Sequence, residues 1–474
     1  MATIRPFQVN NGLEVNLNAN VANALSASDF IQNNPERAYA PTVVFDFAKT
    51  ERLDPRVTFT RASNATYTAA NTLIATANNN IPRFQYENGV CQGLFIELQR
   101  TNLYKYSTDI FTAVDSVRMP GSYMFFDGSV GIRQTGLGTV ANIDYAQSIY
   151  IKINSQSNQT FLLDIGDGVG ITYNANALSV GVWTRLTNIA RQGVSGDFFD
   201  LRINGTKLGL SSNIVWGSSS ASGIATQNYG IAPNGKIEST RISWACTDNT
   251  TFDVELWGFQ VEAGVGGGSS YITSFIPTGA SSATRIHDQA FVNNANNVLS
   301  LNSSQGAFLF VGKTYKTYSA NTPSFDQGTA ALVLQNSDYG TQNNYFNPVT
   351  LSEVTNTLYC GHTGIAPNNA FVGTSISAGA NFLYPNNEVR AVGSYVYTDA
   401  VKQYNVAGSS NGVFVASSSQ NFVTTLAPPI FPDRYLVFGQ NYAQNNRMWN
   451  GPIKKVAYFN RALSNNEVLS LTTI

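Results

Sequence analysis

Short apolar segments rich in β-branched and aromatic residues recur along the whole chain, and polar turn residues separate them. Examples are Val43-Val-Phe-Asp-Phe, Ser148-Ile-Tyr-Ile-Lys-Ile and Tyr435-Leu-Val-Phe-Gly. Such residues favour a pleated, half-buried surface, whereas blocks of Leu, Lys, Glu and Ala, which favour helices, are few. Charged residues make up only 12% of the chain, against about 25% in an average soluble protein. The sequence therefore predicts an all-β fold with very little helix.

The length of the chain predicts more than one domain. With 474 residues and roughly 100 to 200 residues per domain, two or three units are expected. No repeat of fixed period is present, which disfavours solenoids and propellers. We expect two tandem antiparallel β-sandwich (jelly-roll) domains after an extended N-terminal segment. The predicted ranges are 1–42 for an attachment segment, 43–101 for a connecting module, 102–288 for the first sandwich and 289–474 for the second.

The charge balance argues against several classes of partner. The 28 basic and 29 acidic residues nearly cancel, so no basic surface is predicted and nucleic-acid binding is disfavoured. A chain with so little net charge tends to associate, which fits a subunit of an assembly. No stretch approaches the ~18 apolar residues that a membrane span needs, and no export signal is recognisable. The cysteines, Cys91, Cys246 and Cys360, are too far apart to predict a zinc site.

Three motifs in the range 43–101 are similar to segments of known proteins. Thr58 to Tyr67 reads Thr-Phe-Thr-Arg-Ala-Ser-Asn-Ala-Thr-Tyr, Pro82 to Tyr86 reads Pro-Arg-Phe-Gln-Tyr, and Gly93 to Leu103 reads Gly-Leu-Phe-Ile-Glu-Leu-Gln-Arg-Thr-Asn-Leu. This segment resembles a connecting module of tailed-phage tail and appendage proteins. The resemblance implies a structural component of a virion that is made in the host cytoplasm.

The ends of the two predicted sandwiches carry further resemblances. Leu256-Trp-Gly-Phe-Gln-Val-Glu-Ala-Gly and Ala283-Thr-Arg resemble the closing strands of carbohydrate-binding-module-like sandwiches. Tyr458-Phe-Asn-Arg-Ala-Leu-Ser is similar to the last strand of laminin-G-like, concanavalin A-like domains, which a short terminal helix follows. Ser464 and Glu467 predict a capping box at the start of that helix.

The chain offers little for catalysis. Its two histidines, His287 and His362, stand at neither metal nor catalytic-triad spacing. A glycosidase needs two carboxylates roughly 5 to 10 Å apart, and the candidates Glu97, Glu255 and Glu262 belong to strand segments. Alternation places Glu255 on the same strand face as Trp257, where it lies on a strand surface or pairs with an arginine. We therefore predict that the protein is not an enzyme.

Aromatic residues in polar, loop-like segments are candidates for sugar contact, because a sugar ring stacks on an aromatic face while polar groups bind its hydroxyls. Single exposed aromatics also serve packing or interfaces. Trp183 and Trp257 lie in apolar strand patterns and are predicted to be core residues. The candidate glycan contacts are Trp216, Tyr229, Tyr339, Tyr345 and Trp449.

One segment could bind a metal ion. Asp164-Ile-Gly-Asp-Gly-Val-Gly could hold calcium through Asp164 and Asp167, because calcium prefers carboxylate and carbonyl oxygens. The Asp-Gly pair equally predicts a plain hairpin turn. No other cofactor is predicted.

Two functions remain open at this point. The first is a tail fibre or appendage whose N-terminal segment binds other virion proteins and whose lectin-like sandwiches bind a host-surface glycan. Because weak single sites gain strength when copies are tethered together, we expect a homo-oligomer, a trimer if the protein is a fibre. The alternative is a head decoration or neck protein that binds other virion proteins without recognising a sugar.

Overall fold

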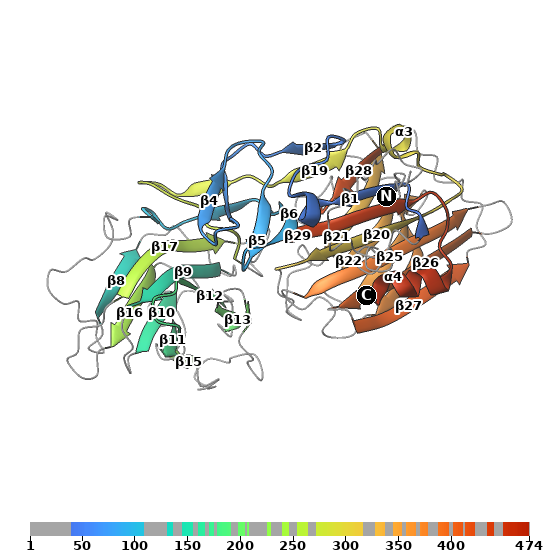
Figure 1. Cartoon of the computed structure of the whole chain (residues 1–474). Coiled ribbons are helices and arrows are strands. Elements are labelled where there is room, and N and C mark those ends of the chain that lie inside the picture. The colour runs from blue at the N-terminus through green and yellow to red at the C-terminus, as the bar shows by residue number, and fades with distance from the viewer. Residues whose placement is uncertain are drawn as a thin grey trace, which may run out of the picture.

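The computed structural model in Figure 1 confirms the all-β class. The residues that the structure describes are 39–108, 130–135, 145–154, 160–165, 170–174, 178–190, 198–203, 206–207, 225–228, 239–245, 254–263, 272–315, 328–336, 345–352, 357–365, 370–377, 387–397, 402–410, 413–421, 434–439 and 449–473. Four larger sheets and one two-stranded sheet contain all the strands of these residues, and every described pair of strands is antiparallel.

The first sandwich, on the left of Figure 1, contains two sheets. One is a seven-stranded sheet, called here the β9 sheet, in the order β14 (Thr206–Lys207), β13 (Phe198–Ile203), β12 (Thr184–Ala190), β9 (Tyr145–Ile153), β17 (Val254–Ala263), β7 (Arg100–Asn102) and β18 (Ala283–Arg285). The other is a five-stranded sheet in the order β15 (Ala225–Asn228), β11 (Gly170–Asn174), β10 (Thr160–Ile165), β16 (Ser239–Ala245) and β8 (Val130–Thr135).

The second sandwich, on the right, has an eight-stranded sheet and a seven-stranded one, called here the β28 sheet. The eight-stranded sheet runs β27 (Val413–Asn421), β26 (Lys402–Ser410), β25 (Glu388–Tyr397), β20 (Gln305–Lys313), β29 (Gly451–Phe459), β6 (Val90–Ile96) and β5 (Phe84–Glu87), and β1 (Val43–Asp46) also pairs with β29. The β28 sheet runs β2 (Val57–Thr60), β19 (Gln289–Val292), β28 (Arg434–Phe438), β21 (Gly328–Asn336), β22 (Tyr345–Ser352), β23 (Thr357–Ile365) and β24 (Ala370–Ser377).

Three short helices and one small hairpin complete the described structure. The helices are α2 (Phe47–Thr50), α3 (Ala295–Leu299) and α4 (Asn465–Thr472), and the hairpin joins β3 (Ala65–Thr68) to β4 (Ile74–Ala77). The Ser464 hydroxyl accepts a hydrogen bond from the Glu467 backbone, and the Glu467 carboxylate accepts one from the Ser464 backbone. The predicted capping box is thereby confirmed. None of the helices among the described residues is long and apolar enough to cross a membrane.

The core of the second sandwich explains its continuous apolar strand β20. Phe308 and Phe310 belong to the cluster between the two sheets, whereas Leu309 and Val311 face the other way. On that outer side they pack in a cluster with Leu471 of α4. Because both faces of β20 are covered, its sequence shows no alternation of polar and apolar residues.

Strands from the range 43–101 contribute directly to the second sandwich. Figure 1 shows the early strands, in blue, beside the red β29. Val43–Asp46 pairs with Lys455–Tyr458, and Leu94–Ile96 pairs with Gly451–Ile453. Their side chains enter the core between the sheets. The division of the chain into four domains stays a prediction, but the strand pairing links its second and fourth ranges.

The first sandwich is inserted into the second through two adjacent strands. The chain leaves along β7 and returns along β18, and these strands pair with each other, Asn102 opposite Ala283 and Arg100 opposite Arg285. Strand β7 also pairs with β17, with Asn102 opposite Glu262, and so connects β18 to the rest of the β9 sheet. The two sandwiches are therefore linked by a pair of strands and not by a single linker.

Gly93 permits the close approach of β6 to β29. Its backbone has φ +115°, and a Cβ atom at this position would lie 2.0 Å from the Ile453 carbonyl oxygen. Only glycine combines that φ with such a contact. The first residue of the motif Gly93 to Leu103 is thus explained by backbone geometry.

Candidate functional site

Four charged residues of the sequence motifs and Asp288 meet where the two sandwiches join. Arg61 follows β2, Arg83 precedes β5, Glu97 follows β6, and Arg285 and Asp288 come from β18 and the residues after it. All five side chains are at most 1% exposed. We call these five residues the junction network.

Glu97 is the centre of the junction network. Its Oε2 atom accepts hydrogen bonds from Arg83 Nη1 and Arg285 Nη1, each at 2.6 Å. Ser274 donates through its backbone nitrogen, at 2.7 Å to Oε1, and through its hydroxyl, at 2.6 Å to Oε2. A buried carboxylate is tolerated when its oxygens are this fully paired.

Asp288 binds the third arginine of the network, Arg61, and shares Arg83 with Glu97. It accepts from Arg61 Nη1 at 3.0 Å and also pairs with Arg83 Nη2. Its Oδ2 atom accepts the backbone N–H of Glu97 at 2.8 Å. Two carboxylates therefore connect three arginines, and the pair Arg61 and Asp288 joins residues that are 227 positions apart in the chain.

The pKa of Glu97 follows from these contacts. Burial by itself would raise the pKa of Glu97, but the charges of Arg285 and Arg83 and the Ser274 hydrogen bonds outweigh burial and hold it below its ordinary value. For Arg83, burial favours the neutral form, yet Asp288 and Glu97 outweigh it and raise the pKa. Three arginines and two carboxylates leave the network within one formal charge of neutrality.

A second set of buried polar contacts ties the β9 sheet to the segment 272–278. Burial raises the pKa of Glu262, which accepts hydrogen bonds from Gln260 Nε2 at 2.6 Å and from the Thr273 backbone at 3.1 Å. Asn102 donates to the Ile276 carbonyl at 2.8 Å and accepts from the Val261 backbone at 3.0 Å. The motif residues Glu97 and Asn102 therefore both hold the segment 272–278 in place.

The chemistry of the junction network is structural. Its carboxylates are sealed from solvent and their oxygens are occupied by arginines, so they are not placed to act as a general acid or base on a ligand. His287, next to Asp288, is half-buried, and burial lowers its pKa. Within the described ranges, no group of histidine, cysteine or carboxylate residues could hold a metal ion.

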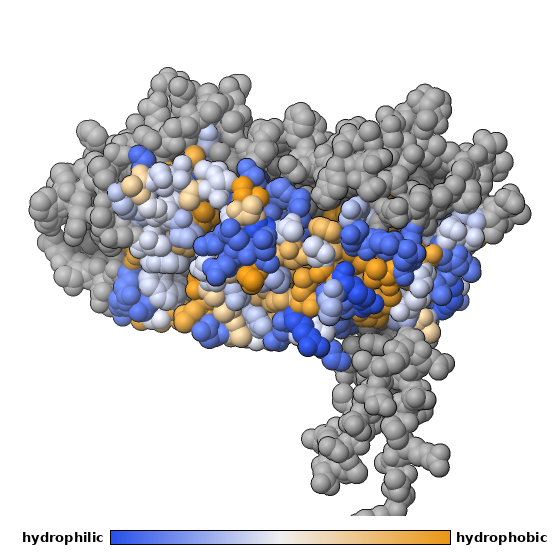
Figure 2. All heavy atoms as spheres, turned by 90° about the horizontal axis from the view of Figure 1, so that it is seen from above, coloured by the Kyte–Doolittle hydropathy of each residue, from blue (hydrophilic) through white to orange (hydrophobic). Residues whose placement is uncertain are grey.

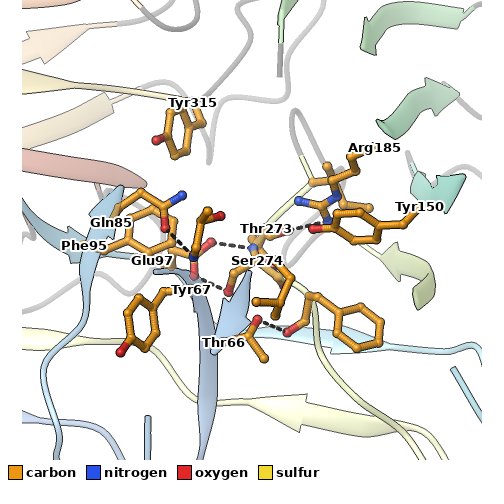
Figure 3. Close-up of a pocket in the computed structure, with 14 residues that line it drawn as sticks. Thr66, Tyr67, Gln85, Phe95, Glu97, Tyr150, Arg185, Thr273, Ser274 and Tyr315 are labelled. Atoms are coloured by element: carbon orange, nitrogen blue, oxygen red, sulfur yellow. Dashed lines mark hydrogen bonds between the residues drawn. The ribbon is translucent and has the colours of Figure 1, made fainter. Parts of the chain in front are cut away.

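A cavity of about 70 Å³ opens beside the network. Figure 3 shows that it lies between the two sandwiches, with Tyr67, Gln85 and Tyr315 on one side and Tyr150 and Arg185 on the other. Glu97 and Ser274 lie between these two groups. We call this cavity the junction pocket.

An exposed aromatic residue lies on the same face of the β9 sheet. Trp183, which directly precedes β12, is 41% exposed. The Lys152 ammonium lies 5.9 Å from the centre of the indole ring and 2.7 Å from Glu255 Oε1. Asn154 Nδ2 donates to the same oxygen at 3.1 Å. We call Trp183, Lys152, Asn154 and Glu255 the Trp183 platform.

Solvent reaches the polar groups of the Trp183 platform. The side chains of Lys152 and Glu255 are 26% and 47% exposed. Hydrogen bonds from Lys152 and Asn154 lower the pKa of Glu255. An indole face beside an ammonium, a carboxylate and a carboxamide offers both stacking and hydrogen bonding, which are the contacts that a sugar ring uses.

The prediction that Trp183 lies in the core is wrong. Thr184 and Leu186 are buried, at 3% and 0% exposure, so the alternate residues Trp183 and Arg185 point to the opposite face of the β9 sheet. Trp257 is half-buried, with its ring 4.5 Å from that of Phe275. The predicted surface location of Glu255 is confirmed, and its ion-pair partner is Lys152 and not an arginine.

Trp449, a predicted glycan contact, is completely buried, so this prediction is wrong. Its ring packs 4.6 Å from that of Phe310, and its Nε1 donates to the Pro452 carbonyl at 3.3 Å. A sugar could reach the ring only if the core of the second sandwich opened. Of the other candidates, Tyr345 lies in β22 and is described in its backbone alone, whereas Trp216, Tyr229 and Tyr339 lie outside the described residues.

The predicted calcium ligands are described only in part. Asp164 lies in β10, and its backbone pairs with Gly170 of β11, the antiparallel arrangement that a hairpin requires. Asp167 lies outside the described residues. The calcium site therefore stays a prediction.

Sequence reasoning missed the junction network and the Trp183 platform. A signal for the first was present, because arginine and glutamate stand inside apolar strand motifs of a chain with few charges. A charge in such a context is either paired or costly. The Trp183 platform could have been predicted from the alternation of the strand. If Leu186 faces the core, Trp183 three positions earlier faces the opposite side of the sheet.

Comparisons with known proteins add likenesses in structure. A scan against protein-family models finds no match, and neither does a search of curated proteins. Among solved structures, the carbohydrate-binding module CBM40 of a Ruminococcus gnavus sialidase, bound to α2,3-sialyllactose, matches 38% of this chain and 86% of its own, with 16% identity and a TM-score of 0.27.

Two further solved structures resemble the chain. A leech intramolecular trans-sialidase matches over 36% of this chain and 24% of its own, with 17% identity and a TM-score of 0.26. Domains LG4-5 of the mouse laminin α1 chain match over 80% of this chain and 95% of their own, with 7% identity and a TM-score of 0.21. These structures are similar in their β-sandwich fold, and the function proposed below rests on this chain's own residues.

Proposed function

We propose that this protein is a non-enzymatic glycan-binding protein and that the Trp183 platform is its binding surface. The observation that carries the proposal is the 41% exposed indole of Trp183 with Lys152, Asn154 and Glu255 beside it. A large exposed aromatic residue with paired polar groups at its edge stabilises little in the folded chain, whereas it matches the apolar face and the hydroxyls of a sugar.

We further propose that the protein is part of a tailed-phage particle and reaches the host surface from it. The support is the resemblance of Thr58 to Tyr67, Pro82 to Tyr86 and Gly93 to Leu103 to the connecting module of phage appendage proteins. In this proposal residues 1–42 bind other virion proteins and several copies assemble, so that weak glycan contacts act together. The location of the protein is then the virion.

The glycan proposal is tested with the full chain on a printed array of bacterial, plant and animal mono- to hexasaccharides. We expect binding to a defined set of glycans, and we expect Trp183→Ala to lose at least tenfold in affinity for them. Val298→Ala is the control, because Val298 is a similarly exposed apolar residue, at 39%, in the second sandwich. Equal binding by the Trp183→Ala variant and the wild type would refute the platform as the binding surface.

The location is tested by cryo-electron microscopy of the intact particle. Projecting oligomers with free sandwiches would support host attachment. Sandwiches packed against the capsid or the neck would instead support the alternative, a head decoration or neck protein without sugar recognition.

A further inference from the structure

We propose that the junction pocket and the Trp183 platform are two parts of one groove, and that the ligand is an oligosaccharide that contacts both sandwiches. The inference rests on the proposed glycan-binding function and adds the length of the ligand and a second binding region. Neither the pocket nor its residues were among the predicted glycan contacts.

The two regions share one face of the β9 sheet. Lys152 and Tyr150 are two positions apart on β9, so their side chains point the same way and lie about 7 Å apart. Lys152 is paired across the sheet with Glu255, and Tyr150 with Arg185 and Trp257. Consecutive rows of side chains therefore lead from the Trp183 platform to the wall of the junction pocket.

The side chains along this path are accessible and aromatic. Tyr150 and Trp257 are half-buried, with their ring centres 5.4 Å apart. The Arg185 guanidinium lies 5.4 Å from the centre of the Tyr150 ring, and its Nη2 donates to the Thr273 carbonyl at 2.8 Å. Rings held in this way are pre-organised, which lowers the entropy lost when a ligand stacks on them.

The junction pocket itself has the chemistry of a sugar site. Figure 3 shows tyrosines on both of its sides and a carboxamide, that of Gln85. The Gln85 oxygen accepts the Thr68 backbone N–H at 3.1 Å, which fixes the orientation of the amide. Because Glu97 is neutralised by Arg83 and Arg285, its carboxylate does not give the pocket a net negative charge. Aromatic rings with hydroxyl and amide groups suit an uncharged, hydroxylated ligand.

The size of the junction pocket sets the kind of ligand. A volume of 70 Å³ holds roughly five water molecules, which is too little for an oligosaccharide. One end of the ligand would enter the pocket and the rest would lie along Tyr150 towards Trp183. A ligand that contacts both regions must be longer than a single sugar ring.

The test is isothermal titration calorimetry of the full chain with the di-, tri- and tetrasaccharide forms of the array glycan that binds most strongly. We expect affinity to rise with length in the wild type. We expect Tyr67→Ala to lose on the order of tenfold in affinity for the longest form, about 1.4 kcal/mol, and to bind the disaccharide as the wild type does. A second variant, Tyr67→Trp, should give the same result by filling the pocket.

The matched control is Leu73→Ala, because Leu73 lies in the turn just before β4 of the same hairpin and is 62% exposed outside the pocket. This variant should bind every length as the wild type does. If the Tyr67 variants bind the longest form normally while Trp183→Ala does not, the second region is refuted and the proposed function stands. If Trp183→Ala also binds normally, the proposed function fails as well.

Discussion

The junction network and the Trp183 platform both pair basic with acidic side chains, but solvent reaches only the Trp183 platform. The side chains of Glu97, Arg83 and Arg285 are at most 1% exposed, whereas those of Lys152 and Glu255 are 26% and 47% exposed. Water weakens the attraction between the exposed pair and also removes the cost of leaving it unpaired. The comparison distinguishes buried ion pairs, which stabilise the fold, from solvent-exposed charged groups, which a ligand can reach.

The contrast extends to tryptophan. Trp449 fills the core of the second sandwich at 0% exposure, whereas Trp183 is 41% exposed at the edge of the first. Other large hydrophobic residues of the described chain are even more exposed, among them Leu73 at 62% and Val90 at 62%, and Figure 2, which looks down on the molecule from above, shows hydrophobic and hydrophilic areas side by side on its surface. Exposure alone therefore does not mark a binding residue, and the polar partners of Trp183 are what distinguish it.

Removing the charge at the centre of the junction network should have the largest effect. Glu97→Ala leaves Arg83 and Arg285 buried without their shared carboxylate, so we expect a loss of about 3 to 5 kcal/mol in the free energy of unfolding. Urea denaturation followed by tryptophan fluorescence measures it. Glu255→Ala is the exposed counterpart and should leave the transition midpoint unchanged. If Glu97→Ala unfolds at the same urea concentration as the wild type, the buried ion pairs stabilise the fold no more than the exposed pair does.

Truncating the buried tryptophan should have an effect of similar size. Trp449→Ala leaves a cavity beside Phe310 and should cost about 3 to 5 kcal/mol. Trp183→Ala should leave the melting temperature close to that of the wild type, because its ring is exposed. Differential scanning calorimetry of the two variants compares them directly. Equal losses would mean that Trp183 also supports the core.

A change at Gly93 should weaken the pairing of β6 with β29 in the eight-stranded sheet. Gly93→Ala forces a Cβ atom against the Ile453 carbonyl at a φ that L-residues avoid, at a cost of about 1 to 3 kcal/mol. Gly279→Ala is the control, because no atom lies within 4 Å of a Cβ at that position. Thermal melts of both variants test this prediction, and a stable Gly93→Ala variant would argue against the pairing of β6 with β29.

The smallest effect is expected at the helix cap. Hydrogen bonds, first from Arg461 and then from Ser464, lower the pKa of Glu467 from 4.5 to about 2. A carboxyl whose folded pKa is lowered stabilises the fold above its unfolded pKa, and that contribution is lost as the pH falls from about 4.5 towards 2. Because solvent reaches the pair, whose side chains are 41% and 23% exposed, Glu467→Gln should cost less than about 1 kcal/mol at pH 7.

The loss in the Glu467→Gln variant should be smaller at pH 2.5 than at pH 7, since the wild-type carboxylate is then partly protonated. Urea denaturation at both pH values measures the difference. A loss that is larger at the lower pH would show that the sign of this linkage is wrong.

Local patterns predicted the class of fold and the terminal helix. Strand segments such as Val43–Asp46 and the capping box of Ser464 and Glu467 depend on residues within a few positions of one another. Pairings such as Gly451 with Ile96 join segments that are far apart in the sequence, and periodicity contains no information about them. The insertion of the first sandwich through β7 and β18 was not predictable for the same reason.

The candidate site was harder to predict than the fold. Trp449 follows a polar stretch, Gln-Asn-Asn-Arg-Met, which is typical of a loop, yet its backbone N–H bonds to the Gly439 carbonyl at 2.7 Å and its ring enters the core. Trp183 stands in an apolar run but points outward because Leu186 points inward. Composition indicates which residue types can bind a sugar, and only the tertiary structure decides which of them are exposed.

The most direct test of the central claim, that the exposed Trp183 platform binds the ligand while buried contacts such as that of Gly93 with β29 stabilise the fold, combines two measurements on Trp183→Ala and Gly93→Ala. The melting temperature of each variant is measured first. The affinity of each variant for the strongest array glycan is then measured at a temperature at which both variants are folded. We predict that Trp183→Ala has the melting temperature of the wild type and loses at least tenfold in affinity. Gly93→Ala should have a lower melting temperature and the affinity of the wild type. Wild-type affinity in Trp183→Ala would contradict the account.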